Sequence, residues 1–351
     1  MFNRGMFIIC LLLLVGVASQ FSYAQSKSYT YSGMCDGSAA VKLDENYFIV
    51  AEDDGEVLRI YKFNDSSVSQ VGAEDDVLKN LTSDSKDEVD IEGAARIGNR
   101  IYWISSHGRN KDGEISGNRY KFFATDLDIT ASPPELSLTE SYDGLVTDVT
   151  KNESWKKSNL TGTQKQKLID LLNNATRMEE EAVPDLAPEK SGLNIEGLAQ
   201  TGDGKSLLIG LRNPLINGKA IIITLTNPAD LVTGKGPAKF GNSYFLELGG
   251  LGIRDMIYST EQKTYFIIGG PLGSDGIFEI FEWDGTQENQ PTSVTTLKTC
   301  PNSSPEAVIY HSNGPQIQII NDEGDKLVGE EKCKKVKKPD KSFTDKWYDL
   351  N

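Results

Sequence analysis

Apolar and polar positions along the chain follow one order that recurs five times. Each segment opens with a short strand of small and apolar residues, turns tightly at polar residues, and continues into a second strand rich in β-branched and aromatic residues. In the first four segments, a loop ending in Asp-Gly or Asn-Gly leads to a third, alternating strand, as hairpin-connected strands do. The five segments begin at Asp36, Asp90, Asn194, Ile253 and Ser304.

The spacing of these segments predicts the fold class. One polar position near the start of each segment falls at Ser38, Glu92, Glu196, Asp255 and Glu306, with spacings of 54, 104, 59 and 51 residues. Antiparallel meanders of about 50 residues are typical of an all-β β-propeller. We expect five or six blades, because the doubled spacing can hide one more. A β-sandwich is the alternative, but it does not explain why the same acidic position precedes the same order of strands.

The doubled spacing contains a helical pattern. Thr163 and Gln166 resemble a capping box, and apolar residues follow at helical spacing at Leu168, Leu171, Leu172 and Ala175. We therefore interpret residues 140–190 as a helical insertion within a single propeller domain of residues 25–351. The insertion either covers the rim of the ring or packs against one edge.

The first 24 residues are typical of a cleaved signal peptide. An arginine precedes an apolar stretch of secretory length, and small residues follow at Ser22 and Ala24. No later stretch has the ~18 apolar residues of a membrane span. We therefore expect a secreted or periplasmic protein.

Charge and cysteine content narrow the function classes. The formal net charge is −15, which argues against a nucleic-acid ligand, because phosphate contacts need clustered Lys or Arg. Three cysteines follow the signal peptide, so one disulfide can form: Cys35 with Cys333 would close a ring, and Cys300 with Cys333 would clip the last repeat. The only histidines are His107 and His311, which argues against a zinc site built from His and Cys.

The propeller hypothesis places the repeated acids around one opening. The first strand of each blade lines the axis, and the second strand runs antiparallel to it, so the start of the first and the end of the second share one rim. Converging carboxylates repel one another and need a positive partner, either a calcium ion or arginines. The alternative is a polar, water-filled channel. The expected metal ligands are Glu92, Glu196, Asp255 and Glu306.

The loops on the same rim suggest a chemistry. We predict catalytic roles for Glu92 as a base, His107 as an acid, and Arg109 and Arg212 as anion clamps, with Ser106, Asn213 and Arg254 as ligand-binding residues. The corresponding function is binding of calcium and an anionic small molecule, with hydrolysis of a phosphoester or other ester by a metal-activated water. The alternative is a non-catalytic ligand-binding or envelope-scaffold propeller with a structural ion. In both cases we expect a monomer.

Three blocks of sequence resemble one family. DIEGAARIGNRIYWISSHGR, NIEGLAQTGDGKSLLIGLRNP and LGGLGIRDMIY are similar to the domain of unknown function 3616 family. The resemblance covers most of the chain and implies an exported, propeller-like protein without a settled activity. A looser similarity is to phytase-like propellers. The family blocks fall on Glu92, Gly93, Ser106, His107, Arg109, Glu196, Gly197, Arg212, Asn213, Pro214, Arg254 and Asp255.

Overall fold

Five antiparallel sheets form the ring of the described structure. The computed structural model of the chain describes residues 25–52, 57–66, 78, 81, 88–155 and 157–350, so the predicted signal peptide lies outside the described residues. Blade one contains β3 (Gly37–Lys42), β4 (Tyr47–Glu52) and β5 (Val57–Lys62). Blade two contains β6 (Ile91–Ile97), β7 (Arg100–Ser105), β8 (Phe122–Asp128) and β9 (Glu135–Leu138), and blade three contains β10 (Asn194–Gln200), β11 (Leu207–Asn213), β12 (Ala220–Leu225) and β13 (Phe240–Leu246). Blade four contains β14 (Gly252–Ser259), β15 (Thr264–Gly270), β16 (Phe278–Trp283) and β17 (Thr292–Leu297).

Blade five combines both ends of the described chain. Its inner strands are β18 (Ser304–His311) and β19 (Gln316–Asp322), followed by β22 (Ser342–Asp349), which pairs with β1 (Gln25–Lys27) and β2 (Thr30–Ser32). The Cys35–Cys333 disulfide joins the same two regions, while Cys300 is exposed and free. The structure thereby selects one of the two pairings that the sequence left open.

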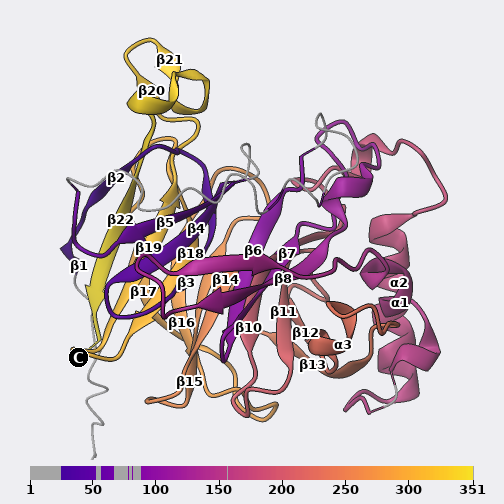
Figure 1. Cartoon of the computed structure of the whole chain (residues 1–351). Coiled ribbons are helices and arrows are strands. Elements are labelled where there is room, and N and C mark those ends of the chain that lie inside the picture. The colour runs from indigo at the N-terminus through magenta and orange to yellow at the C-terminus, as the bar shows by residue number, and fades with distance from the viewer. Residues whose placement is uncertain are drawn as a thin grey trace, which may run out of the picture.

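The ring is closed by contacts between neighbouring inner strands. The strands β3, β6, β10 and β14 each contact the next in order, and β18 contacts both β14 and β3. Figure 1 shows β18, β19 and β22 of blade five beside β3 to β5 of blade one. The structure is therefore a five-bladed β-propeller, which confirms the predicted fold class and decides between five and six blades.

Missing side chains permit the close approach of the inner strands. A Cβ atom at Gly93 would lie 2.8 Å from the carbonyl oxygen of Glu196, and one at Gly197 would lie 2.7 Å from Cγ2 of Ile253. These distances are too short for real contacts. The two glycines of the repeated block therefore let β6, β10 and β14 crowd together near the axis.

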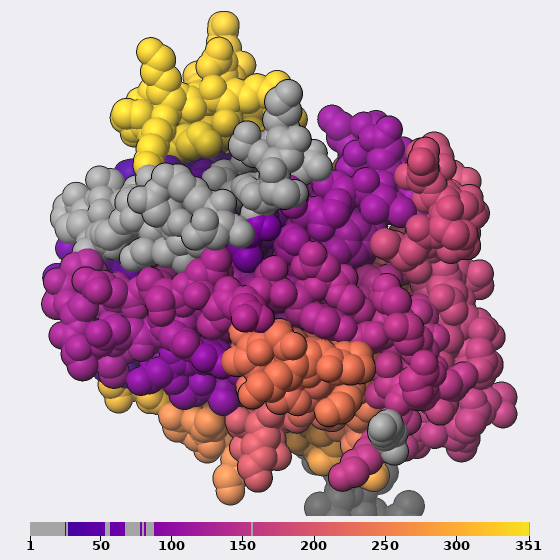
Figure 2. Space-filling model, turned by 45° about the vertical axis from the view of Figure 1, so that its right-hand side comes forward, coloured from indigo at the N-terminus to yellow at the C-terminus, as the bar shows by residue number. Residues whose placement is uncertain are grey.

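The helical segment packs against the outside of blades two and three. It contains α1 (Leu145–Val149) and α2 (Gly162–Thr176), and the buried residues of α2 join a core that includes Trp155 and Phe240. Figure 2 shows the chain around residues 140–190 on the outer flank of the molecule. Among the described residues, no helix combines the length and the apolar character that crossing a bilayer requires.

The cap of α2 differs from the prediction. Thr161, not Thr163, is the N-cap: its hydroxyl accepts the N–H of Gln164 at 3.3 Å, and the Gln164 side chain accepts the Thr161 N–H at 3.0 Å. Two Thr-x-x-Gln patterns overlap in this sequence, so spacing could not separate them.

The remaining elements are short. They are α3 (Pro228–Leu231), the hairpin of β20 (Leu327–Val328) and β21 (Glu331–Lys332), and 3₁₀ turns at Gly117–Arg119, Asn152–Ser154, Pro184–Leu186, Cys333–Lys335 and Lys338–Asp340. The β20–β21 hairpin stands out from the ring, at the top of Figure 1.

Candidate axial binding site

Each inner strand contains a β-bulge near its first residue. The pairing with the second strand shifts between Gly37 and Ala39 in blade one, and at the equivalent point in the other four blades. A bulged residue has no direct partner across the ladder, and its side chain is redirected. The bulged residues are Ser38, Glu92, Glu196, Arg254 and Glu306, and all five line one cavity.

The bulge corrects one predicted residue. In blade four, Arg254 occupies the bulged position that the sequence analysis assigned to Asp255. Neighbouring residues of a strand face opposite sides, so an offset of one residue exchanges the side chain that faces the cavity. Asp255 is buried and does not line the cavity; its carboxylate accepts the N–H of Val308 at 2.8 Å.

Asp255 therefore has a different place in the ring. This hydrogen bond connects β14 with β18. Burial raises the pKa of Asp255 well above its ordinary value, because a carboxylate loses its water there. We interpret Asp255 as a link between blades four and five.

The cavity has a volume of about 1260 Å³. Carboxylates beyond those of the bulges line it, including Asp36, Asp90 and Asp322, and Phe278 adds an aromatic ring. Asp322 ends β19, the second strand of blade five. Because the ends of second strands were predicted to lie on this rim, Asp322 could have been predicted from the sequence. Asp90 forms an ion pair with Arg119, which also lines the cavity.

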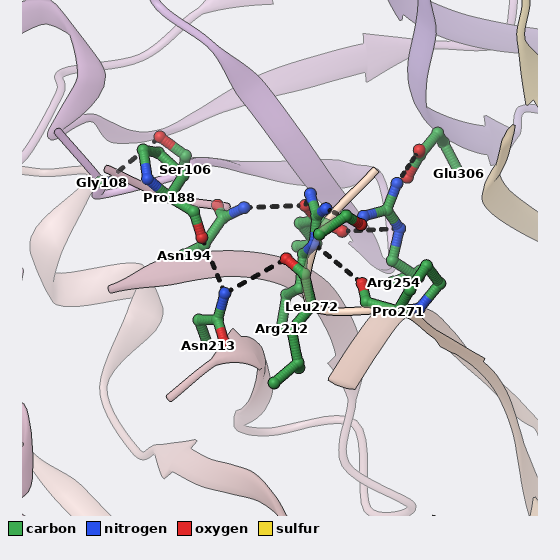
Figure 3. Close-up of polar contacts among 12 residues, drawn as sticks. Ser106, Gly108, Pro188, Asn194, Arg212, Asn213, Arg254, Pro271, Leu272 and Glu306 are labelled. Carbon is green, nitrogen blue, oxygen red and sulfur yellow. Dashed lines mark hydrogen bonds and ion pairs between the residues drawn. The ribbon is translucent and has the colours of Figure 1, made fainter. Parts of the chain in front are cut away.

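A network of ion pairs connects three of the bulged residues, Glu196, Arg254 and Glu306 (Figure 3). Glu196 contacts Nε of Arg254 at 3.0 Å and accepts hydrogen bonds from Nη1 of Arg212 and Nδ2 of Asn194, both at 2.9 Å. The opposite end of the Arg254 guanidinium donates to Glu306. Arg254 thus stands between two glutamates and offsets their repulsion, in the place where the sequence analysis considered calcium or arginine.

Glu306 is the glutamate with the clearest change in acidity. Burial raises the pKa of Glu306 to about 7, since the ionised carboxylate loses its hydration. Arg254 opposes this change, whereas the negative charges of Glu196 and Asp322 add to it. Burial also raises the pKa of Asp322.

The last two residues of β11 hold the wall of the cavity in place. Arg212 donates from Nε to the carbonyl of Pro271 at 3.2 Å and from Nη2 to that of Gly273 at 2.6 Å. Asn213 donates to the carbonyl of Pro188 at 2.7 Å (Figure 3). The loop of blade four and the segment after α2 are therefore held together at the cavity.

Arg109 does not line the cavity, and its guanidinium donates to backbone carbonyls. Its guanidinium is buried and donates to the carbonyls of Thr176, Arg177, Glu180, Glu181 and Gly113 at distances of 2.7 to 3.2 Å. Carbonyls at a helix C-terminus carry partial negative charge, which a cation neutralises. Arg109 therefore fixes the end of α2 and the segment that leads to the cavity wall.

Ser106 and His107, the other two predicted residues of the loop after β7, also do not line the cavity. Ser106 is buried, and its hydroxyl accepts the N–H of Gly108 at 3.2 Å (Figure 3). His107 is buried; Nδ1 lies 2.8 Å from the carbonyl oxygen of Ser105, and burial lowers its pKa to about 4. The structure thus brings together Glu92, Glu196, Arg212, Arg254 and Glu306, but places Ser106, His107, Arg109 and Asp255 behind the lining; Asn213 supports the wall.

The family model described as "Protein of unknown function (DUF3616)" matches residues 37–314. The chain belongs to this family. The match covers all five inner strands and the rim loops described above. No curated protein is significantly similar to the chain in sequence.

Several solved structures align with most of this chain at low sequence identity. The Cps50 (Swd1) β-propeller domain of Myceliophteria thermophila is 10% identical with a TM-score of 0.39, and the alignment covers 94% of this chain and 100% of that one. The PQQ-bound aldose sugar dehydrogenase of Streptomyces coelicolor is 11% identical with a TM-score of 0.43, over 93% and 99%. Kuenenia stuttgartiensis hydrazine synthase is 10% identical with a TM-score of 0.38, over 83% and 57%. These similarities indicate nothing about function.

Proposed function

We propose that this protein binds small positively charged ligands in its axial cavity. The observation that carries the proposal is the charge of the lining, in which ten Asp and Glu residues stand against six Lys and Arg residues. A cleft with one prevailing sign of charge concentrates ligands of the opposite sign. The formal net charge of −15 acts in the same direction.

The partners of the arginines make an anion a poorer fit. All three nitrogens of the Arg212 guanidinium donate to Glu196, Pro271 or Gly273. Arg254 lies between Glu196 and Glu306, so its charge is already balanced. Arg212 and Arg254 are the cavity-lining arginines that were expected to bind an anion, and both already have protein partners. For this reason, the proposal includes neither an anionic ligand nor ester hydrolysis.

Calcium is a second candidate occupant. It is favoured by the same excess of carboxylates and by Glu92, which lines the cavity and is partly exposed. However, calcium takes six to eight oxygen ligands. Within the ranges that the structure describes, no group of three or more His, Cys, Asp or Glu side chains is arranged to hold a metal ion.

We also propose an extracytoplasmic location, as the sequence predicts. The Cys35–Cys333 disulfide supports it, because such bonds persist mainly in oxidising compartments. Binding at the cavity would then respond to solutes outside the cytoplasm.

Titration calorimetry at constant ionic strength tests the binding proposal. The probes are 1,4-diaminobutane, calcium chloride, sodium acetate and sodium phosphate. We expect heat from at least one of the two cations and none from the two anions. Glu92→Gln should weaken cation binding several-fold, because it removes one charge from the lining with little change of shape.

The matched control is Glu261→Gln. Glu261 is exposed in the turn between β14 and β15, which lies at the opposite end of the inner strands from the cavity. This substitution changes the net charge equally but should leave binding unchanged. Tighter binding of the anions, absence of binding by both cations, or equal effects of the two substitutions would contradict the proposal.

A further inference from the structure

A second cavity lies at the other end of the channel. It has a volume of about 410 Å³, within the range of small-molecule pockets. The second halves of the inner strands β3, β6, β10 and β14 line it, together with Val308 of β18. Because residues at the starts of the same strands line the axial cavity, the two cavities open on opposite rims of the ring. We call the second one the apolar cavity.

The apolar cavity has a different lining from the axial one. Ten of the described residues that line it carry aliphatic or thioether side chains, and they come from all five blades. They include Ala40, Ala94, Leu198, Met256, Ile257 and Val308. The axial cavity, in contrast, is lined mostly by polar and charged residues. The apolar cavity therefore suits a hydrocarbon group, which loses its contact with water there.

One arginine borders this apolar lining. Arg96, near the end of β6, is half-buried and lines the apolar cavity. Its guanidinium donates to the carbonyls of Gly98 at 2.7 Å and Lys42 at 3.1 Å, and to that of Leu43. These partners are uncharged, and within the described residues Arg96 has no ion pair with a carboxylate. The carbonyls thus hold the guanidinium in place but do not balance its charge.

The charged groups near Arg96 compensate it only in part. Asp44 is the acid that acts on Arg96, but its carboxylate accepts two backbone N–H groups of its own turn at 2.6 and 2.8 Å. Glu45 pairs with Lys42 at 2.7 Å. Burial lowers the pKa of Arg96, because the guanidinium loses hydration that Asp44 only partly replaces. A guanidinium in this state gains from an added anion.

We propose that the apolar cavity binds monocarboxylates with a short hydrocarbon chain, whose carboxylate pairs with Arg96 and whose chain contacts the aliphatic lining. The inference goes beyond the proposed cation binding and does not depend on it, since the two ligands have opposite charges and enter opposite rims. A phosphate or a dicarboxylate is a poorer fit. Lys42 is already paired with Glu45, so a second negative charge would lie in the apolar lining without a partner.

Equilibrium dialysis of the wild type at constant ionic strength tests both parts of the ligand. The probes are sodium acetate, butyrate, hexanoate and octanoate. Each added methylene group should tighten binding about two- to four-fold, because it buries further apolar surface. Acetate, which has the charge without the chain, should not bind detectably. 1-Hexanol, which has the chain without the charge, should bind about ten-fold more weakly than hexanoate.

Two variants test the position of the carboxylate. Gln200 is half-buried and lines the apolar cavity, so Gln200→Glu adds a negative charge there with little change of shape. It should weaken hexanoate binding about five-fold or more and leave 1-hexanol binding unchanged. The matched control is Gln262→Glu, in the exposed turn between β14 and β15 on the same rim but outside the lining. Arg96→Met should abolish the preference for hexanoate over 1-hexanol.

The possible results bear on separate parts of the inference. Equal affinities for hexanoate and 1-hexanol, or equal effects of Gln200→Glu and Gln262→Glu, would overturn the role of the carboxylate. An affinity that does not rise from butyrate to octanoate would overturn the contact with the chain. If the wild type does not bind octanoate, the site itself is wrong, whereas cation binding at the axial cavity is tested by its own titration and stands or fails independently.

Discussion

At the scale of single residues, one bulge determines the charge of the axial opening. Arg254 and Asp255 are neighbours, yet the first lines the cavity between two glutamates and the second links β14 to β18 behind the lining. If Asp255 occupied the bulge, all four charged bulge positions would carry carboxylates. Because Arg254 occupies it, the opening has an internal counter-charge.

Glu306→Gln should change how stability depends on pH. A carboxyl group whose pKa rises from 4.5 in the unfolded chain to about 7 in the folded one binds more protons when folded. Its contribution to the free energy of unfolding is present below about pH 4.5 and is lost as the pH rises toward 7. Relative to the wild type, Glu306→Gln should therefore gain about 2–3 kcal/mol between pH 5 and pH 8.

Urea unfolding of both proteins at the two pH values measures this difference. Glu261→Gln, an exposed substitution at the opposite rim, should follow the wild-type pH dependence. Parallel curves for wild type and Glu306→Gln would show that Glu306 titrates in the native protein much as it does in the unfolded chain.

At the scale of elements, the loop after β7 and the end of β11 support the cavity from behind. Arg109 follows β7 and holds the carbonyls at the end of α2, while Asn213 ends β11 and holds Pro188 of the wall. The family blocks SSHGR and RNP therefore contain residues that anchor the segment between α2 and β10. Such anchoring demands the same buried hydrogen-bond donors that an anion site would, which is why the sequence pattern alone suggested an anion clamp.

Arg109→Met should loosen this segment while the ring stays folded. The substitution removes the donors for five carbonyls, and loss of buried hydrogen bonds to a charged group typically costs about 2–4 kcal/mol. We expect a lower urea midpoint and faster proteolysis within residues 177–190. Arg100→Met is the control, because Arg100 pairs with Asp126 at the surface and should cost less than about 1 kcal/mol.

Mapping the proteolytic cleavage sites shows which part of the Arg109→Met protein loses stability. Cleavage confined to residues 177–190 is the expected pattern for Arg109→Met. Equal stability of the Arg109 and Arg100 variants would contradict the anchoring role, and uniform cleavage over all blades would show that Arg109 supports the entire ring.

At the scale of the whole molecule, closure of the ring joins the two ends of the described chain. The strands β1 and β2 pair with β22, and the Cys35–Cys333 disulfide connects positions 298 residues apart. Blade five can bury both faces only if these N-terminal strands complete it, as an aromatic cluster of Tyr31, Phe343 and Trp347 indicates. The disulfide therefore supports the step that makes the five sheets one ring.

Replacing both disulfide cysteines should lower the melting temperature. In the Cys35→Ser/Cys333→Ser protein we expect a loss of about 2–5 kcal/mol, because a long loop in the unfolded chain is no longer closed. Dithiothreitol should lower the melting temperature of the wild type in the same way. Cys300→Ser is the control and should have no effect, as Cys300 is exposed and free. An unchanged melting temperature of the double variant would indicate that strand pairing alone closes the ring.

The sequence by itself determined the strands, their order and the polarity of each blade. Strand alternation and turn dipeptides are local properties, so they predicted the propeller, and strand direction then placed Glu92, Glu196 and Glu306 at one opening. The loop bearing Arg109 was also located correctly along the chain, although its partners were not, whereas Arg212 lies within β11 and not in the loop after it.

Only the tertiary structure decided the number of blades, the disulfide partner of Cys35, and the side chain that each bulge directs toward the axis. It also decided that Arg109 contacts carbonyls more than sixty residues away and that Arg254, not Asp255, faces Glu306. The physical reason is that strand formation follows from neighbours along the chain, whereas register and hydrogen-bond partners depend on groups that only folding brings together.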